Sequence, residues 1–331
     1  MERWYPKYYM EFRCLAGACP DSCCKEWEVD VDPASSAYYR ALPGDLGDRL
    51  RQVLRDTEDG TVMTIENGRC PMWRQDGLCR IQAELGHDSL CQVCRAFPRL
   101  RHEYGDFEEL GLELSCPEAA RLILTSPEQG FVTEAVTGGE EPDYDRDAMA
   151  ILRRTRAEIL AFLEDTDLPV PQTLAVMMLY GYEAQSELDG GEPAALNPEK
   201  ALADADRFAG AGEMERIFAF FRGLEVLTDR WKKLLSAPGK CCWQEIHRAL
   251  ARYFVQRYWL QAVSDYDLIG RVKLTVIACL LVSAMEGDPV ELAQLFSKEI
   301  ENDPDNVDAI LDGAYTHPAL TDTVLLGLLL G

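Results

Sequence analysis

The chain has 331 residues, 47% of them apolar, so it is long enough to bury a sizeable core and is not a disordered protein. Its formal net charge of -24 argues against nonspecific nucleic-acid binding, because that binding needs a basic face. The first residues, MERWYPKYYMEFRC, lack a signal-peptide core, and the longest apolar run, LTVIACLLVSAM, is shorter than the roughly 20 residues of a bilayer crossing. We therefore expect a cytoplasmic protein with no transmembrane segment.

The first third of the chain is predicted to form a cysteine-rich domain. Nine of the twelve cysteines lie at or before Cys116, and short apolar segments alternate with turns such as ALPGDLGD and ENGRCP. We expect short helices, loops and a hairpin over residues 1–125. Residues 126–147 are rich in turn formers and acidic side chains and are expected to be an acidic linker.

Apolar residues recur at helical spacing after this linker, which predicts an α-helical domain over residues 148–331. We expect helices in DAMAILRRTRAEILAFLED, EMERIFAFFRGLEVLTDRWKKLLS, WQEIHRALARYFVQRYWLQAVS, YDLIGRVKLTVIACLLVSAM and PVELAQLFSKEI. Asp288 before Pro289 is the preferred order for the start of the last helix. LNPEKALADADRF is either a weaker helix or a connector, and the C-terminal TDTVLLGLLLG is either a docked helix or a shortened end.

The expected fold class is mostly α, with the cysteine-rich metal-binding domain packed on the helical bundle. The acidic excess is larger in the second part: residues 126–331 hold 35 Asp and Glu against 18 Lys and Arg, whereas residues 1–125 hold 22 against 15. This excess suits either a solubilising surface or a basic partner.

The cysteines are expected to bind metal. Disulfides are rare in a reducing cytoplasm, and the βαβ context of a thioredoxin-like CQVC motif is missing. The candidate ligands fall into two runs and a later residue: Cys14, Cys19, Cys23 and Cys24; Cys70, Cys79, Cys91 and Cys94; and Cys116. Four thiolates suffice for one zinc ion or one iron-sulfur cluster, so nine can serve two sites.

The spacing of these cysteines limits how they can share a centre. Cys91 and Cys94 lie one turn apart on a helix, whereas the neighbours Cys23 and Cys24 require a turn or different partners. Cys241, Cys242 and Cys279 lie in apolar helical sequence and are expected in the core.

The cysteine motifs carry a family resemblance. The segments YYMEFRCLAGACPDSCCKEWEVDVD, CPMWRQDGLCRIQAELGHDSLCQVCRAFPR and LELSCPEAARLIL resemble the flagellin lysine-N-methylase family in order and in flanking residues. RYWLQAVSDYDLIGRVKLTVIACLLV is similar to the helical half of that family. The cysteine-rich part also resembles putative zinc- or iron-chelating domains.

The first resemblance implies methyl transfer from S-adenosylmethionine to lysine side chains of flagellin, with a 4Fe-4S cluster held by four of the nine cysteines. Zinc is the alternative metal, and a non-catalytic chelating module is the alternative function. The chain has neither a G-x-G-x-x-G after a strand nor a Cys-x3-Cys-x2-Cys motif, because Glu26 occupies the last position of the latter. Whether methyl transfer is polar or radical stays open, as do the oligomeric state and the choice of lysines.

The reaction needs a lysine without its proton, since the usual lysine pKa is about 10.4. Asp30 and Asp32 are the candidate catalytic residues, because they lie beside the cysteines and share one face if the chain is extended. Asp32 before Pro33 is equally typical of a helix cap. Arg99 is the candidate for the carboxylate of the methyl donor, with a surface ion pair as the alternative, and Trp27 is the candidate for stacking on adenine or a cation, with core packing as the alternative.

Overall fold

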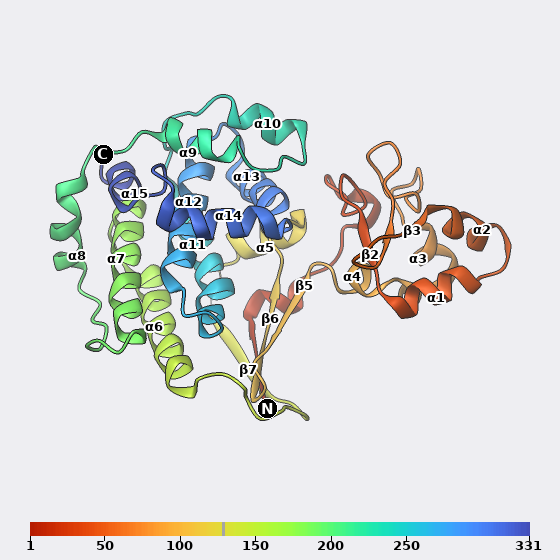
Figure 1. Cartoon of the computed structure of the whole chain (residues 1–331), viewed down its shortest axis with the longest axis horizontal. Helices are drawn as coiled ribbons and strands as arrows, with labels where there is room; N and C mark the ends of the chain where they lie inside the picture. The colour runs from red at the N-terminus through yellow and green to blue at the C-terminus, as the bar shows by residue number, and fades with distance from the viewer. Residues whose placement is uncertain (128–129) are drawn as a thin grey trace.

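The computed structural model describes residues 1–127 and 130–331 and shows a mostly α protein (Figure 1). The helices are α1 (Pro33–Ala41), α2 (Gly44–Val53), α3 (Arg80–Leu85), α4 (Gln92–Ala96), α5 (Pro117–Thr125), α6 (Arg146–Asp165), α7 (Val170–Leu188), α8 (Pro198–Ala205), α9 (Met214–Phe221), α10 (Asp229–Leu235), α11 (Glu245–Tyr258), α12 (Leu268–Ala284), α13 (Pro289–Phe296), α14 (Pro304–Thr316) and α15 (Asp322–Leu329). The strands are β1 (Glu2–Pro6), β2 (Val29–Val31), β3 (Leu54–Asp56), β4 (Thr61–Met63), β5 (Arg99–Glu103), β6 (Phe107–Leu112) and β7 (Phe131–Ala135). The short 3-10 helices are η1 (Lys7–Glu11), η2 (Ala16–Ala18), η3 (His87–Ser89), η4 (Asp206–Phe208) and η5 (Trp259–Val263), and η6 (Ser297–Glu301) is a π-helix.

The strands form two small sheets. One has the order β5-β6-β1-β7, in which β1 runs parallel to β6 and antiparallel to β7, and the other has the order β2-β4-β3 with antiparallel pairs. The antiparallel pair β5-β6 is the expected hairpin. Strand β1 comes from the first residues of the chain, so its pairing with β6 and β7 is a long-range contact that local patterns do not indicate.

The buried apolar side chains form two separate clusters. The smaller runs from Val29 to Cys91 and includes Tyr39, Leu50 and Met72, whereas the larger joins residues of β6 and η1 to the helices that follow. Figure 1 shows the corresponding arrangement, with α1–α4 and β2–β4 in a smaller body beside the helical one. The smaller body therefore has a core of its own.

The predicted boundaries at 125 and 148 are not tested by these clusters and stay a prediction. Residues before 125 contribute to both clusters, and the expected linker over 126–147 includes strand β7. Two linker residues, 128 and 129, lie outside the described residues.

Most of the expected helices are confirmed. The segment over 147–165 is α6, and the long apolar run lies in α12, where every residue except Ile269 is buried. Asp288 caps α13 as predicted, by accepting from the N–H groups of Val290 and Glu291. LNPEKALADADRF contains α8 and η4, and the C-terminal segment contains the docked helix α15.

One expected helix is wrong. Residues 213–236 form two helices, α9 and α10, with Arg222–Thr228 between them. The second helix starts anew because the Thr228 hydroxyl accepts from the Trp231 N–H and caps it. Helices α7 and α14 were not predicted.

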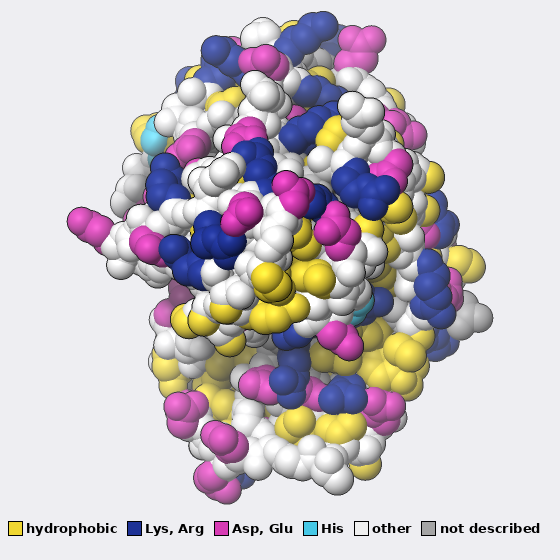
Figure 2. Space-filling model, turned by 90° about the vertical axis from the view of Figure 1, so that its right-hand side faces the viewer, with side chains coloured by type: hydrophobic (Ala, Val, Ile, Leu, Met, Phe, Trp, Pro, Cys, Tyr) yellow, Lys and Arg dark blue, Asp and Glu magenta, His cyan; other side chains and the backbone are white. Residues whose placement is uncertain are grey.

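The surface charge is mixed at the end of the molecule that the smaller body forms. Figure 2 shows Lys and Arg side chains interspersed there with Asp and Glu. Within the described ranges, no helix is both long and apolar enough to cross a bilayer.

A buried ion pair joins the larger sheet to the helices. The Arg156 guanidinium in α6 donates to both carboxylate oxygens of Glu109 in β6, with Nη1 2.8 Å from Oε2, and the two side chains are 3% and 8% exposed. Arg156 Nη1 also donates to the Gln256 carbonyl of α11. The pair therefore fixes β6 against two helices.

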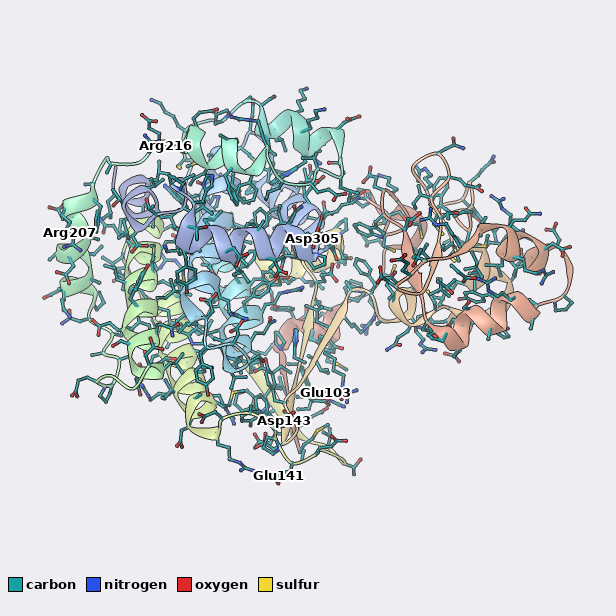
Figure 3. All side chains as sticks on the ribbon, viewed as in Figure 1. Glu103, Glu141, Asp143, Arg207, Arg216 and Asp305 are labelled. Carbon is teal, nitrogen blue, oxygen red and sulfur yellow. The ribbon has the colours of Figure 1, made fainter. Side chains whose placement is uncertain are left out.

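Replacing Arg156 by Met is expected to lower the free energy of unfolding by about 3–5 kcal/mol, because the Glu109 charge stays buried without its partner. Urea unfolding measures this loss, and the double variant with Glu109→Gln should recover part of it. Glu141→Gln removes an exposed pair with Arg146 and is the control (Figure 3), with an expected change of about 0–1 kcal/mol. Equal losses for the two single variants would contradict the structural role of the buried pair.

Candidate functional site

The nine N-terminal cysteines approach one another in two groups. Charge interactions link Cys14 with Cys19, Cys23 and Cys116, which we call the first thiol group. The second thiol group consists of Cys24, Cys70, Cys79, Cys91 and Cys94, which are linked in the same way. All twelve cysteines of the chain are free, so the disulfide interpretation finds no support.

Cys23 and Cys24 lie in a turn, as their adjacency predicts, and connect the two groups. Their side chains contact each other, and Cys24 also contacts Cys70. Hydrogen bonds from Cys23 and Cys70 lower the pKa of Cys24, whereas the same contacts raise the pKa of the donors. Cys24 is thus the thiol of this trio that ionises first.

Three cysteines occupy the N-cap positions of helices: Cys79 of α3, Cys91 of α4 and Cys116 of α5. None of the three sulfurs caps its helix with a hydrogen bond, and burial raises the pKa of Cys79 and Cys116, although the N–H groups of the following turn oppose this rise. Such donors stabilise a thiolate. Cys94 lies one turn beyond Cys91, and its side-chain hydrogen bond lowers the pKa of Cys91 to about 7.

The thiol chemistry fits a metal ion or iron-sulfur cluster, since soft sulfur donors gather here and neighbouring cysteines lower the pKa of Cys24 and of Cys91. In the part of the chain that the structure describes, however, no three His, Cys, Asp or Glu side chains converge on one point as metal ligands. The grouping of the thiols is a finding, and the metal site stays a prediction.

A cleft of about 500 Å³ lies where the cysteine-rich segment meets the helical body. Cys23 of the first thiol group and Cys94 of the second both line it, and both are exposed. Trp27, Val93 and Phe97 supply apolar walls. The charged lining consists of Glu26, Glu28, Asp30, Glu113, Glu225, Glu299, Asp303 and one cation, Lys298.

The Lys298 ammonium connects the two sides of this cleft. It is 2% exposed and lies in η6, 3.0 Å from Asp21 Oδ2 and 2.6 Å from Glu26 Oε2. Its Nζ also lies 5.0 Å from the centre of the Trp27 ring. The amide of Gln294 donates to Asp21 from the preceding helix α13. Carboxylates and an aromatic ring of the cysteine-rich segment therefore surround an alkylammonium from the helical body.

The π-helix η6 explains why consecutive charged residues are buried. Glu299 accepts from the Leu227 N–H at 2.7 Å and from the Thr228 hydroxyl, and burial raises its pKa. Glu301 pairs with Arg257 at 3.0 Å inside the helical body. The sequence did not indicate this cluster, because SKEIE reads as an exposed helix end, and π-helices are frequent at functional sites.

The structure brings some of the predicted site residues together and separates others. Asp30 in β2 and Trp27 line the cleft, and the Trp27 indole donates to the Cys23 carbonyl at 3.1 Å. Arg99 lies outside the cleft lining and over the Phe12 ring at 5.1 Å. Its assignment to a methyl donor stays untested.

Asp32 has a structural role outside the cleft. It accepts from the Ser35 N–H at the start of α1 and from the Gln92 N–H at the start of α4. The helix-cap interpretation is thereby confirmed, whereas a catalytic role stays a prediction. Asp30 lines the cleft whereas Asp32 does not, since Asp32 follows β2 as the N-cap of α1.

Comparisons with known proteins identify relatives of this chain. The flagellar biosynthetic protein FliU of Salmonella muenchen is 30% identical over 162 residues, which are 45% of this chain and 88% of FliU. The chain belongs to the family of FliU and its relatives. Two proteins named lysine-N-methylase, from Salmonella typhimurium and Salmonella choleraesuis, are each 29% identical over 142 residues.

The two lysine-N-methylases are matched over a smaller share of their length than FliU is. The match takes in 39% of this chain but 34% of each lysine-N-methylase, so the chain spans about a third of their length. No family model matches the chain, and no solved structure matches it.

Asp32→Ala is expected to lower the unfolding free energy of this FliU relative by about 0.5–2 kcal/mol at pH 7, because it removes the acceptor for two helix starts. The Gln92 N–H, followed by the Ser35 N–H, lowers the pKa of Asp32 to about 2 from an ordinary value of 3.8. A lowered pKa stabilises the fold above the ordinary value, and this contribution is lost as pH falls toward 2.

The difference in unfolding free energy between Asp32→Ala and the parent chain should therefore shrink as the pH is lowered from 5 to roughly 2. Urea unfolding at each pH measures it. Asp32→Asn keeps an oxygen acceptor and is the matched control, with little loss at pH 7. A loss that is the same for Ala and Asn would argue against the capping role.

Proposed function

We propose that this protein is a lysine N-methyltransferase that transfers a methyl group from S-adenosylmethionine to lysine side chains of flagellin. The observation that carries the proposal is the acidic, aromatic-walled cleft that touches both thiol groups, in a chain related to FliU and to proteins named lysine-N-methylase. Flagellin, the methyl donor and the cytoplasmic location are parts of this proposal.

The cleft suits a cationic substrate. Carboxylates and aromatic rings bind alkylammonium and sulfonium groups, and both the lysine and the methyl donor carry such a cation. Lys298 supports this assignment from within the chain, because its ammonium already lies against Trp27 and between Asp21 and Glu26. A substrate lysine entering beside it would meet the same kinds of groups.

Two carboxylates of the cleft have different environments and different proposed tasks. Asp30 is exposed in β2 and attracts the incoming cation. Glu299 is largely buried, and its raised pKa makes it a stronger base than an exposed carboxylate. We assign Glu299 to accepting the proton that lysine must lose before its nitrogen can attack the methyl group. As the nitrogen–carbon bond forms, the sulfur–carbon bond of the donor breaks, so the amine becomes a methylated ammonium and the donor leaves as a neutral thioether.

The thiol groups are proposed to hold an iron-sulfur cluster, with zinc as the alternative. The second thiol group is the favoured ligand set, because direct contacts join Cys24 to Cys70 and Cys91 to Cys94. A bound metal would supply a cross-link between the loops around the cleft and, if it is iron, a redox-active centre.

The double variant Cys91→Ser, Cys94→Ser is expected to abolish iron binding in protein purified without oxygen, because it removes two adjacent ligands. Iron and sulfide content, together with absorption near roughly 400 nm, measure the cluster. Cys279 is buried as expected, but Cys242 is exposed and lies outside any helix, so its expected place in the core is wrong. Cys242→Ser therefore changes an exposed cysteine outside both groups and should keep the metal. Retained iron and colour in the double variant would remove this pair from the ligand set, and zinc without colour in the parent chain would favour the chelating module.

Asp30→Asn is expected to raise KM for flagellin several-fold while leaving the metal content unchanged, and Glu299→Gln is expected to lower kcat about 10²-fold or more, as loss of a general base does. Quantifying methyl-lysine in flagellin by mass spectrometry, with S-adenosylmethionine as donor, gives both constants.

Asp305→Asn is the matched control for these two variants. Asp305 is an exposed carboxylate at the start of α14 (Figure 3) and does not line the cleft. Unchanged turnover in both cleft variants would refute their roles, and a parent chain that retains its metal but transfers no methyl group would refute the enzyme.

A further inference from the structure

A second cavity lies on another part of the molecule, between the larger sheet and helices α6 and α11. Its volume is about 460 Å³, within the range of small-molecule sites, and it shares no lining residue with the cleft. Four arginines line it: Arg153, Arg154 and Arg156 from α6 and Arg252 from α11. We call this cavity the arginine pocket.

The four arginines differ in their partners. Arg154 pairs with Glu158 and Glu187, and Arg156 pairs with Glu109. Within the described residues, Arg153 and Arg252 make no ion pair with a carboxylate within 4.0 Å. The Arg153 guanidinium lies over the rings of Trp4 at 4.3 Å and Phe107 at 4.9 Å. Two guanidinium groups are therefore left to face a ligand.

Of Arg153 and Arg252, Arg252 has the larger desolvation cost when its guanidinium has no partner. Its Nε is buried without a hydrogen-bond partner, and burial lowers the pKa of the guanidinium. The carboxylate whose charge raises the pKa of this guanidinium against burial is the exposed Glu164, which also lines the pocket. Within the described residues, a chain with 57 acidic side chains keeps this half-buried guanidinium without an ion-pairing carboxylate, although its Nε is shielded from water.

Apart from Glu164, Gln256 and Gly130, the rest of the lining is apolar or aromatic. Trp4 and Phe131 come from β1 and β7, and Ala157, Leu160 and Ala161 come from one face of α6. Two unpaired guanidinium groups against the single carboxylate of Glu164 leave one positive charge. This balance favours a monoanion, whereas the apolar walls favour a carbon body over a bare inorganic ion.

We propose that the arginine pocket binds a small organic monoanion, a carboxylate carried on an aromatic or apolar body. Arg252 and Arg153 hold the carboxylate, and Trp4, Phe131 and Leu160 cover the body. A guanidinium suits this group because it donates two parallel hydrogen bonds to a carboxylate.

Phenylacetate is the probe, and isothermal titration calorimetry on the full chain at low salt is the measurement. Phenylacetamide has nearly the same shape without the charge, and inorganic phosphate has the charge without the body. The parent chain is expected to bind phenylacetate at one site and to bind the other two compounds at least about tenfold more weakly, which corresponds to roughly one charged hydrogen bond.

Arg252→Gln is expected to weaken phenylacetate binding about tenfold or more. Arg252→Lys keeps the charge but not the paired donors, so its affinity is expected to lie between those of the parent chain and Arg252→Gln. Arg207→Gln is the matched control, because Arg207 lies far from the pocket on η4 (Figure 3). This variant should bind phenylacetate as tightly as the parent chain does. Circular dichroism checks that each variant is folded, and Arg252→Lys tests the proposal if Arg252→Gln is not.

Several results would overturn the proposal. They are absence of phenylacetate binding to the parent chain, equal affinity for acid and amide, or equal binding by the parent and both Arg252 variants. Phosphate binding as tight as phenylacetate would also overturn it, because the apolar body would then contribute nothing.

Discussion

The buried ammonium of Lys298 is the interaction on which the cleft depends. An isolated ammonium costs several kcal/mol to remove from water, so it is buried only where opposite charges and a ring replace that water. Asp21, Glu26 and Trp27 supply them, and all three belong to the short segment that also carries Cys19, Cys23 and Cys24. The position of these thiols relative to the helical body is therefore coupled to one lysine of η6. The two sides of the cleft are held at a spacing that this side chain sets.

A second set of buried charged groups bonds η6 to helix α11. Glu301, at the end of the π-helix, accepts from the hydroxyls of Tyr253 and Tyr258 and pairs with Arg257, and all three partners lie on α11. The Tyr253 hydroxyl in turn accepts from the Leu114 N–H, just before Cys116. The wider turn of a π-helix lets consecutive side chains point to different partners, so Lys298 reaches the cysteine-rich segment while Glu301 reaches the core. The cleft wall is rigid on the helical side because both ends of η6 are bonded.

The sequence predicts the features that arise from local chemistry. Helical periodicity locates α6 and α12, the Asp-Pro order locates the cap of α13, and the adjacency of Cys23 and Cys24 predicts their turn. It does not predict the larger sheet, because β1 pairs with strands more than a hundred residues away. The β1 sequence ERWYP also lacks the alternation of apolar and polar residues that marks a strand. The sequence pattern predicts one helix where the structure has α9 and α10, because the helical spacing of apolar residues continues past Thr228, which caps α10. At the site, residue type points to the cysteines and Trp27, but Lys298 and Glu299 come from tertiary packing and read as solvent-exposed in the sequence.

The net charge of the chain does not predict the charge of the cleft or of the arginine pocket. The chain carries -24 overall, yet the cleft concentrates carboxylates around one lysine, whereas the arginine pocket leaves two guanidinium groups facing apolar walls. Each arrangement costs desolvation energy that a surface distribution of the same charges would avoid. The acidic surplus itself does not explain the cleft, since exposed acidic side chains keep a protein soluble without gathering in a recess. The cleft and the arginine pocket share charged side chains that lie beside aromatic rings in a recess, where water screens an ion of opposite sign less than on an open surface. The fold thus provides separate environments for a cation and for an anion within one acidic chain.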